Sequence, residues 1–461
     1  MKAKIKFIGA CGTVTGSKTL FEVDDLKVLI DCGLFQGSKT LRLENWSIFP
    51  YSGQIDAVVL THAHIDHSGY LPKLVKEGFK GKIYCSHATA DLCKIMLLDA
   101  AHLQEEDSEF ANETGHSRHK PAMPLYTVAD AEKCLEFLQP VADEEWHALS
   151  PNLSFKMIRS GHILGSRFIH LNVSDSYKSK YITFSGDIGN GRSTVIKGAS
   201  TVPYSDIVII ESTYGDRIQE KTDPKIDLKK HINAAIEREG VVVIPAFSVG
   251  RTQELIHLIA QLKEAGEIGE IKIYVDSPMS LKVTDLYLRY KDELLLEIDE
   301  RNVELPLSIS SFEGIRSPDE SMLLTMQDGP FIVISAAGML NGGRVLHHLK
   351  KRLPDERNTI LFVGYQATET KGRLLQSGID KLRIHHEEIP VNANIETIAS
   401  MSAHADQADL VNWLKEFSPA PKKVFINHGE TQAAQALQEK LRDSLGIDAI
   451  IAEPDLEFEI F

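Results

Sequence analysis

The sequence predicts an α/β protein of two domains, the second inserted into the first. Short β-rich runs fill the first half of the chain. After residue 211 strands alternate with helical segments, a pattern typical of βαβ units around a parallel sheet. A last strand at residues 424–426 follows the alternating region. For a chain of 461 residues, a size prior of about 150 residues per domain also favours more than one domain.

The predicted strands define the domain boundaries. In the first half they are residues 4–8, 26–30, 57–60, 82–85, 155–158, 181–184 and 206–210. In the second half they are residues 241–244, 272–275, 331–335, 359–364 and 424–426. We therefore expect residues 1–212 to form the first part of one domain, residues 213–395 the inserted domain, and residues 396–461 the return segment.

Composition and charge limit the possible classes of protein. Hydrophobic residues make up 43% of the chain and charged residues 25%, as in ordinary globular proteins. The net charge of −15 argues against a broad nucleic-acid-coating surface. It does not exclude an anionic substrate, because metal ions and a few arginines can make one cleft locally positive.

Targeting signals and cysteine usage indicate a location. The first residues alternate lysine with apolar residues, as in a half-buried strand rather than a signal peptide. No apolar run approaches the roughly 20 residues that span a bilayer. The five cysteines are scattered and form no CxxC pair, which fits a reducing compartment. We predict a cytoplasmic protein without membrane contact.

A cluster of metal-ligand side chains follows the strand at residues 57–60. His62, His64, Asp66 and His67 place three imidazoles and a carboxylate within six residues. Neutral imidazole and carboxylate oxygen are the ligands that zinc favours in catalytic sites. Chance histidines in a surface loop are the alternative, but four candidate ligands in so short a run make that interpretation weak.

Two more candidates follow later strands. His162 lies in the run Ser160–Gly165, and Asp187 ends the run Phe184–Asp187. Taken singly, each could be a capping carboxylate or a buried histidine bonded to the backbone. A carboxylate has two oxygens and can bridge two metals, so beside the histidine cluster both are predicted to be ligands.

Seven short runs together resemble the motifs of the metallo-β-lactamase superfamily and its β-CASP nuclease group. The runs are Asp31–Gly37, His62–His67, His162, Asp187, Ile210–Gly215 (motif A), Ser402–Asp406 (motif B) and Asn427–Glu430 (motif C). The resemblance covers nearly the whole chain. It implies a four-layer αββα sandwich with an inserted Rossmann-like β-CASP cap domain.

The same resemblance implies a role for each matching residue. One zinc ion would be held by His62, His64, His162 and Asp187. The second would be held by Asp66, His67, Asp187 and His428, so that Asp187 bridges two Zn²⁺ ions. Asp31 would support the ligands from behind, and Asp66, Glu211 and His404 would be catalytic.

These assignments imply a zinc-dependent ribonuclease. Water bound by two zinc ions loses its proton near neutral pH, and the ions stabilise the charge that develops in an in-line phosphoryl displacement. His404 would help to protonate the leaving oxygen with Glu211 orienting it, giving a 5′-phosphate and a 3′-hydroxyl. The chain resembles the compact bacterial form of polyadenylation-type endonucleases, which implies RNA as partner and a homodimer.

Loops of the inserted domain offer candidate phosphate contacts. Ser335 and Gly338 follow one strand, and small residues there let backbone N–H groups approach an oxyanion. Arg251 and Arg344 could pair with phosphate through two hydrogen bonds. The glycine-rich run Gly9–Gly16 lacks the GxGxxG spacing of a dinucleotide site, so we expect it to line the metal site instead.

Other functions remain open from the sequence. A DNA nuclease of the same group is one, although members that act on DNA tend to have valine where His428 stands. A small-molecule hydrolase of lactamase or thioesterase type would need neither the cap nor motifs A to C. A flavodiiron-like oxidoreductase typically carries HxExD rather than HxHxDH, and a non-catalytic scaffold would not need every ligand position filled.

Overall fold

The computed structural model describes residues 1–115, 119–175, 177–295, 312–364, 366 and 370–461, which form two compact units. Unit 1 comprises Met1–Gly191, Gly198–Ile218 and His404–Phe461, and unit 2 comprises Arg192–Lys197 and Gln219–Ala403. The inserted domain was expected at residues 213–395. The main segment of unit 2 begins and ends a few residues later, and unit 2 also includes residues 192–197.

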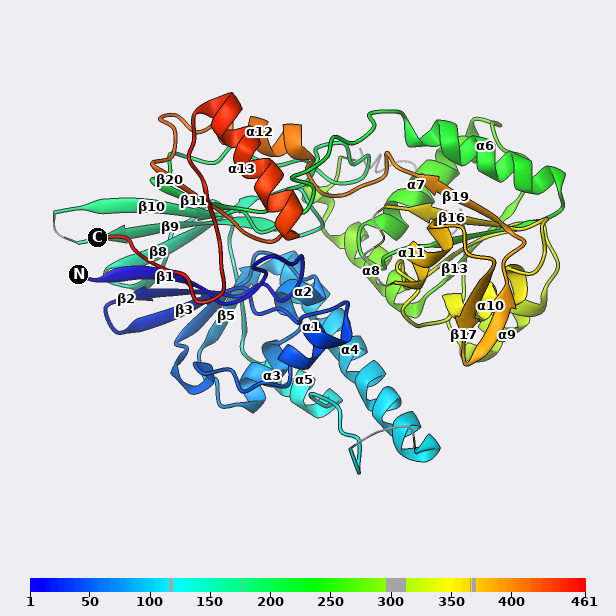
Figure 1. Ribbon diagram of the computed structural model, residues 1–461, viewed down its shortest axis with the longest axis horizontal. Coiled ribbons are helices and arrows are strands. Elements are labelled where there is room, and N and C mark those ends of the chain that lie inside the picture. Colours follow the sequence, from blue (N-terminus) through cyan, green and yellow to red (C-terminus); the bar gives the residue numbers. More distant parts are fainter. Residues whose placement is uncertain (116–118, 176, 296–311, 365, 367–369) are drawn as a thin grey trace. The chain divides into compact units, whose positions relative to one another are not determined.

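Unit 1 contains two sheets that face each other, with helices outside them (Figure 1). The first sheet has the order β22 (Glu457–Glu459), β1 (Ala3–Phe7), β2 (Thr19–Val23), β3 (Leu26–Ile30), β4 (Ala57–Val59), β5 (Lys82–Ser86), β6 (Leu138–Val141). The second has the order β21 (Ile450–Ile451), β20 (Lys423–Ile426), β11 (Ile207–Ile210), β10 (Ser179–Phe184), β9 (Arg167–Ser174), β8 (Leu153–Arg159), β7 (His147–Ser150).

Helices cover the outer faces of this sandwich (Figure 1). Those on the side of the first sheet are α1 (Lys39–Glu44), α2 (Ile65–Ser68), α3 (Leu71–Lys76), α4 (His87–Thr114) and α5 (Val128–Leu135), with a 3₁₀ turn at Ser52–Gln54. Those on the side of the second are α12 (Gln407–Lys415) and α13 (Thr431–Leu445).

The period-two patterns of the strands build the core between the sheets. In β1 the alternation of lysine with apolar residues leaves Ile5 and Phe7 fully buried while Lys4 and Lys6 stay half-buried. Phe155 and Ile169 meet them from the second sheet. Apolar residues on the opposite face of that sheet, including Phe168, pack with α12 and α13. The central strands of the second sheet are thus held on both faces, which fixes where their ends lie.

Unit 2 has a parallel sheet. Its order is β14 (Glu313–Gly314), β13 (Lys272–Asp276), β15 (Phe331–Ser335), β12 (Val241–Pro245), β16 (Thr359–Val363), β19 (Asn394–Ile398). The strands β12, β15 and β16 are buried along their whole length, as expected where helices cover both faces of a parallel sheet.

The remaining elements of unit 2 lie around this sheet (Figure 1). They are the helices α6 (Pro224–Glu237), α7 (Arg251–Glu264), α8 (Pro278–Arg289), α9 (Pro318–Met326), α10 (Val345–Arg352) and α11 (Lys371–Gln376), a 3₁₀ turn at Lys291–Glu293, and the hairpin β17 (Lys381–Ile384) and β18 (Glu387–Pro390). The predicted α/β class, a sandwich with an inserted parallel-sheet unit, is confirmed.

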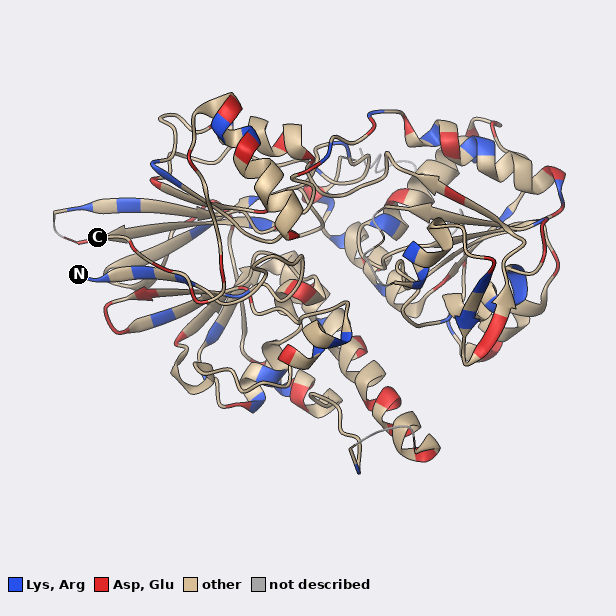
Figure 2. Cartoon of the chain, viewed as in Figure 1, with Lys and Arg blue, Asp and Glu red and all other residues tan. Residues whose placement is uncertain are grey.

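Charged residues are spread over both units and mixed in sign (Figure 2). The helix α6 carries lysines beside acidic residues, whereas the outer half of α4 is mainly acidic. A polyanionic ligand would therefore be bound by groups close to its binding site rather than by a broad basic surface. Within the described ranges, no helix combines the length and the apolar character needed to cross a membrane.

Candidate metal centre

The predicted ligands lie in unit 1, each just beyond the end of a strand. His62 follows β4, His162 follows β8, Asp187 follows β10 and His428 follows β20. Because β10, β11 and β20 are parallel neighbours, their carboxyl ends meet at one edge of the sheet. Residues far apart in the sequence are therefore brought to one place.

One glycine shows how tightly the loops meet there. Gly186, directly before Asp187, has a φ of +50°, and a Cβ atom at this position would lie 2.6 Å from the Thr61 side chain. Only glycine fits both the backbone conformation and the space. The Asp187 loop therefore lies directly against the start of the His62 loop.

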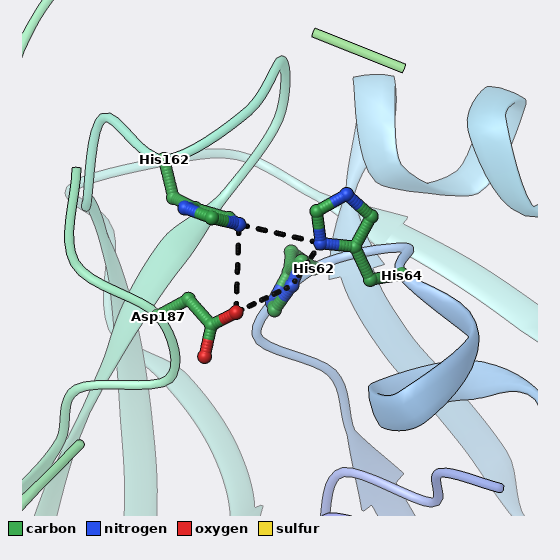
Figure 3. A group of neighbouring side chains, drawn as sticks. All are labelled: His62, His64, His162 and Asp187. Atoms are coloured by element: carbon green, nitrogen blue, oxygen red, sulfur yellow. Dashed lines mark hydrogen bonds and ion pairs between the residues drawn. The ribbon is translucent and has the colours of Figure 1, made fainter. Parts of the chain in front are cut away.

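The first ligand set consists of His62, His64, His162 and Asp187 (Figure 3). His64 Nδ1 lies 3.0 Å from His62 Nε2 and 3.3 Å from His162 Nε2. Asp187 Oδ2 lies 3.5 Å from His62 Nε2 and 3.4 Å from His162 Nε2. The four ligand atoms therefore surround one point.

The second ligand set consists of Asp66, His67 and His428. His67 Nε2 and His428 Nε2 are 3.0 Å apart. Asp66 Oδ2 lies 3.7 Å from His67 Nε2 and 3.5 Å from His428 Nε2. Asp187 Oδ1 lies 3.3 Å from His67 Nε2 and 3.4 Å from His428 Nδ1. The two oxygens of Asp187 thus face different sets, which is the arrangement of a bridging carboxylate.

These separations fit a tetrahedral metal site. With metal–ligand bonds of about 2.0–2.1 Å, tetrahedral zinc ligands lie roughly 3.3 Å from one another. The separations given above for the first set scatter closely around that value. In addition, the buried Asp187 Oδ1 accepts no hydrogen bond from the residues that the structure describes. A cation would satisfy this oxygen.

The protonation states of the histidines also suit metal binding. Burial lowers the pKa of His64, and it lowers the pKa of His62 and of His162 well below the ordinary value. These imidazoles are therefore neutral, as a metal ligand must be. Burial opposes the charged form of His67 as well, but three carboxylates outweigh it and raise the pKa of His67 well above the usual range. A cation can neutralise this excess of negative charge.

A hydrogen-bonded carboxylate supports the second set from behind. At 2.7 Å, His67 Nδ1 donates to Asp31 Oδ2, which leaves Nε2 facing the other ligands. The backbone N–H of Thr61 donates to Asp31 Oδ1 at 2.8 Å, and the Thr61 hydroxyl lies 3.1 Å from His62 Nδ1. Asp31 and Thr61 together orient one imidazole of each set.

His404 and Glu211 form a pair beside the ligands. His404 Nδ1 lies 3.4 Å from both oxygens of Glu211 and 3.9 Å from Asp187 Oδ2. Glu211 is 1% exposed, and its Oε1 accepts the Ile188 backbone N–H at 2.6 Å. Burial opposes protonation of His404, but Glu211 and Asp187 outweigh it and raise the pKa of His404 to about 9. The imidazolium form is therefore favoured at neutral pH.

A small cavity lies behind His67 and His428. Its volume of about 30 Å³ is enough for one or two ordered water molecules. Asp31 and Glu211 both line it, and so does Asn427, whose buried Oδ1 has no hydrogen-bond partner among the described residues. Water in this cavity would complete the hydrogen bonding between the two supporting carboxylates.

The four predicted phosphate contacts lie in unit 2. Ser335 is 1% exposed, and its hydroxyl donates to the Asp276 carbonyl at 3.1 Å. Gly338 lies in the loop after β15, with its carbonyl accepting from Gln366 at 3.0 Å. Both arginines already have carboxylate partners, Arg251 with Glu254 and Arg344 with Asp276. Their proposed contact with phosphate stays a prediction.

Several supporting residues were not identified from the sequence. Thr61 has a local signal, since a hydroxyl residue directly precedes the first ligand. Lys18, which is buried near the metal loops, has none, because a lysine that follows a glycine-rich loop is expected to be exposed. The buried pair of Asp276 and His348 in unit 2, with Nε2 2.8 Å from the carboxylate, joins residues 72 positions apart.

Comparison with known proteins decides the family. Family models match residues 12–149 (metallo-beta-lactamase superfamily), 252–375 (Beta-Casp domain) and 388–452 (Zn-dependent metallo-hydrolase RNA specificity domain). Ribonuclease TTHA0252 of Thermus thermophilus is 34% identical over 433 residues, 93% of this chain and 94% of that protein. The chain belongs to the β-CASP group of the metallo-β-lactamase superfamily. It is therefore a metal-dependent hydrolase, and the family predicted from the motifs is confirmed.

Two further relatives support this β-CASP assignment. The RNase J-like protein of Methanocaldococcus jannaschii is 32% identical, covering 92% of both chains. Transcription termination factor FttA of the same organism is 30% identical over 93% of this chain and 67% of its own length. A crystal structure of a protein of unknown function from Enterococcus faecalis matches over 100% of this chain and 100% of its own, with a TM-score of 0.54 and 13% identity. That likeness concerns the fold alone.

Proposed function

We propose that this β-CASP protein is a ribonuclease that uses two zinc ions to hydrolyse RNA phosphodiester bonds, leaving a 5′-phosphate and a 3′-hydroxyl. The observation that carries the proposal is the pair of ligand sets that share Asp187. RNA is favoured by the relatives named ribonuclease and by the family model for RNA specificity over residues 388–452.

The ligand types favour zinc at both positions. His62, His64 and His162 would hold one ion, Asp66, His67 and His428 the other, and Asp187 both. Imidazole and carboxylate at tetrahedral separations suit zinc better than the all-oxygen shells of magnesium or calcium. When bound, two zinc ions supply Lewis-acid stabilisation of phosphoryl charge and lower the pKa of water.

His404 is the proposed proton donor. In the metal-free chain Glu211 and Asp187 raise its pKa to about 9, and the contact with Glu211 favours the imidazolium form that can give a proton to the leaving 3′-oxygen. Glu211 orients the ring and is itself held by the backbone N–H groups of Ile188 and Thr213. Asp66 keeps a side chain that is 18% exposed, which allows it to accept a hydrogen bond from the attacking water.

The remaining sequence predictions belong to this proposal. We propose that RNA phosphates are contacted by Ser335, Gly338, Arg251 and Arg344. Each arginine would bind a phosphate while its guanidinium stays paired with its carboxylate partner. A homodimer is proposed from the resemblance alone. A cytoplasmic location is supported by the five free cysteines, since disulfides are rare there.

The test is digestion of RNA labelled at either end, with matched DNA oligonucleotides as the comparison. The zinc-loaded chain should cut RNA to products with a 5′-phosphate. A chelator should abolish the cutting and added zinc should restore it. Exclusive cutting of DNA, or RNA cutting that survives removal of the metal, would contradict the proposal.

Product length then separates the modes of cleavage. Internal fragments from both labels indicate an endonuclease, and stepwise release from the 5′ label indicates a 5′-to-3′ exonuclease. Substrates with and without a 5′-phosphate should be compared in parallel.

A further inference from the structure

Lys18 is a buried lysine that no ion pair neutralises within the described parts of the chain. It is 4% exposed and lies just before β2. Its Nζ donates to the carbonyl of Gly33 and lies over two rings, 4.9 Å from the centre of Phe35 and 4.6 Å from that of Tyr70. The nearby Cys32 thiol does not supply a charge, because burial raises its pKa to about 12.

This environment only partly compensates for the buried charge. An ammonium has three donors, and Lys18 uses one on a carbonyl while the ring faces provide cation–π contacts. Burial opposes the charged form and lowers the pKa of Lys18 to about 8. A methionine of similar length would fill the same space without that desolvation cost. Stability therefore does not explain why a lysine stands here.

The partner of Lys18 lies against the second ligand set. Gly33 touches the Asp66 backbone so closely that a Cβ atom on Gly33 would lie 1.5 Å from the Asp66 carbonyl oxygen. The backbone N–H groups of Cys32 and Leu34, on either side of Gly33, donate to the carbonyls of His67 and Ile65 at 2.7 and 2.9 Å.

Residue 17, next to Lys18, joins the same network. The Ser17 N–H donates to the Asp66 carbonyl at 2.8 Å, and the Ser17 carbonyl accepts the Gly33 N–H at 2.9 Å. The segments 17–18 and 32–34 thus form a cradle around the backbone of Asp66 and His67. Among the described residues, no comparable hydrogen-bonded link joins the first ligand set to Lys18.

We propose that Lys18 is a positioning residue for the Asp66–His67 half of the metal centre. Its ammonium fixes the Gly33 carbonyl, and the cradle transmits that constraint to the backbone of the two ligands. The proposal rests on the proposed two-zinc function. It predicts that Lys18 matters for the second zinc ion and little for the first.

The test is zinc titration of the metal-free Lys18→Met chain, with Lys94→Met as control. Lys94 is 54% exposed, so its substitution removes the same charge at the surface. Removal of a supporting contact should weaken one of the two zinc affinities by roughly 10- to 100-fold. Because a poorly compensated buried charge is lost, the melting temperature of the metal-free chain should stay the same or rise.

Two backgrounds identify which zinc ion is affected. In His162→Ala the first set is disabled, so Lys18→Met should weaken the affinity for the zinc ion that remains in the second set. In His428→Ala the second set is disabled, so Lys18→Met should change little. Phe35→Leu removes one ring and leaves every charge, so it should weaken binding of the same zinc ion to a smaller degree. This variant replaces Lys18→Met in the test if the Lys18→Met chain does not fold.

Some results would overturn the proposal. They are unchanged zinc affinities in both Lys18→Met and Phe35→Leu, equal weakening in both backgrounds, or parallel loss of both affinities with a lower melting temperature. These measurements need no RNA. A chain that binds two zinc ions in the predicted manner without cutting RNA would contradict the ribonuclease and leave the assignment of Lys18 standing.

Discussion

Two strand edges carry the predicted functional residues, and they differ in how the side chains are used. At the edge of unit 1, carboxylates and imidazoles face one another across distances that suit a shared cation. In unit 2, Arg344 points its Nη1 at Asp276, 2.9 Å away, and Asp276 is 1% exposed. The first arrangement is incomplete without a ligand, whereas the second already satisfies its own charges.

This difference separates a polar cluster that binds an ion from one that only supports the fold. In unit 1 the buried Asp187 Oδ1 has no hydrogen-bond donor among the residues that the structure describes, and three carboxylates surround the His67 imidazole. In unit 2 the single carboxylate of Asp276 has three donors: Arg344, His348 and Ser321. Unsatisfied, like-charged groups predict a bound ion, and satisfied groups of opposite charge predict a rigid support.

The largest expected effect is that of Asp187→Ala. Loss of the carboxylate that faces both ligand sets should reduce RNA hydrolysis below detection and lower the zinc content, while the fold persists. Asp175→Ala, which removes an exposed carboxylate after β9, is the control. Zinc analysis and RNA turnover measure the two effects, and full activity in Asp187→Ala would remove the basis for a bridging role.

His404→Ala should have the next largest effect. A general acid contributes roughly 10²- to 10⁴-fold, so kcat should fall by that factor while both zinc ions remain bound. Metal analysis of the variant separates this role from that of a ligand. Loss of zinc would reassign His404 to the ligands, and unchanged kcat would reject it as a proton donor.

The pH dependence sharpens the same assignment. The pKa of His404 is raised from an ordinary 6.5 to about 9, so the proton and its contact with Glu211 are present at neutral pH and lost as pH rises through about 9. Activity of the wild type should fall over that range, and so should the stability contributed by the pair. His404→Ala should lack this alkaline limb; an identical limb in the variant would assign it to another group.

Asp31→Asn should have a moderate effect. An amide has no charge and only one acceptor oxygen, so it cannot accept from both the Thr61 N–H and His67 Nδ1–H as the carboxylate does, and zinc affinity should fall roughly 10- to 100-fold. Competition with a chromophoric chelator measures the affinity, and excess zinc should restore most of the activity. If excess zinc restores nothing, Asp31 acts on the reaction rather than on the metal.

The sequence was informative about side-chain type and less so about strands and supports. The ligands could be predicted because imidazole and carboxylate have few other reasons to cluster after strands. The strand β9 was missed because Arg167, His170 and Asn172 interrupt its apolar pattern. Here His170 is buried beside Thr183, 2.9 Å away, and only the neighbouring strand makes that possible.

The cradle around Lys18 could not be predicted for a related reason. Its aromatic partner Tyr70 and its acceptor Gly33 come from separate loops, and a local pattern cannot show that a lysine will be buried. The pairing of Asp276 with His348 is similar, since β13 and α10 meet only after folding. The structure thus adds contacts between residues far apart in the sequence, which no local pattern predicts.

Arg344→Gln should have the smallest effect on hydrolysis and tests unit 2 directly. If Arg344 contacts an RNA phosphate, the slope of log affinity against log salt should fall by about 0.7, with zinc content unchanged. Asp276→Asn should instead lower stability by roughly 3–5 kcal/mol, because it breaks a buried ionic network. An unchanged salt slope in Arg344→Gln would leave the arginine with a structural role only.

The most direct test of the central claim is anomalous diffraction at the zinc edge from crystals of the zinc-loaded chain. Two peaks are expected about 3.5–4 Å apart, one on each side of Asp187. Each should lie about 2.0–2.2 Å from the nitrogens and oxygens of its own set. A single peak, or peaks away from Asp187, would contradict the two-metal centre.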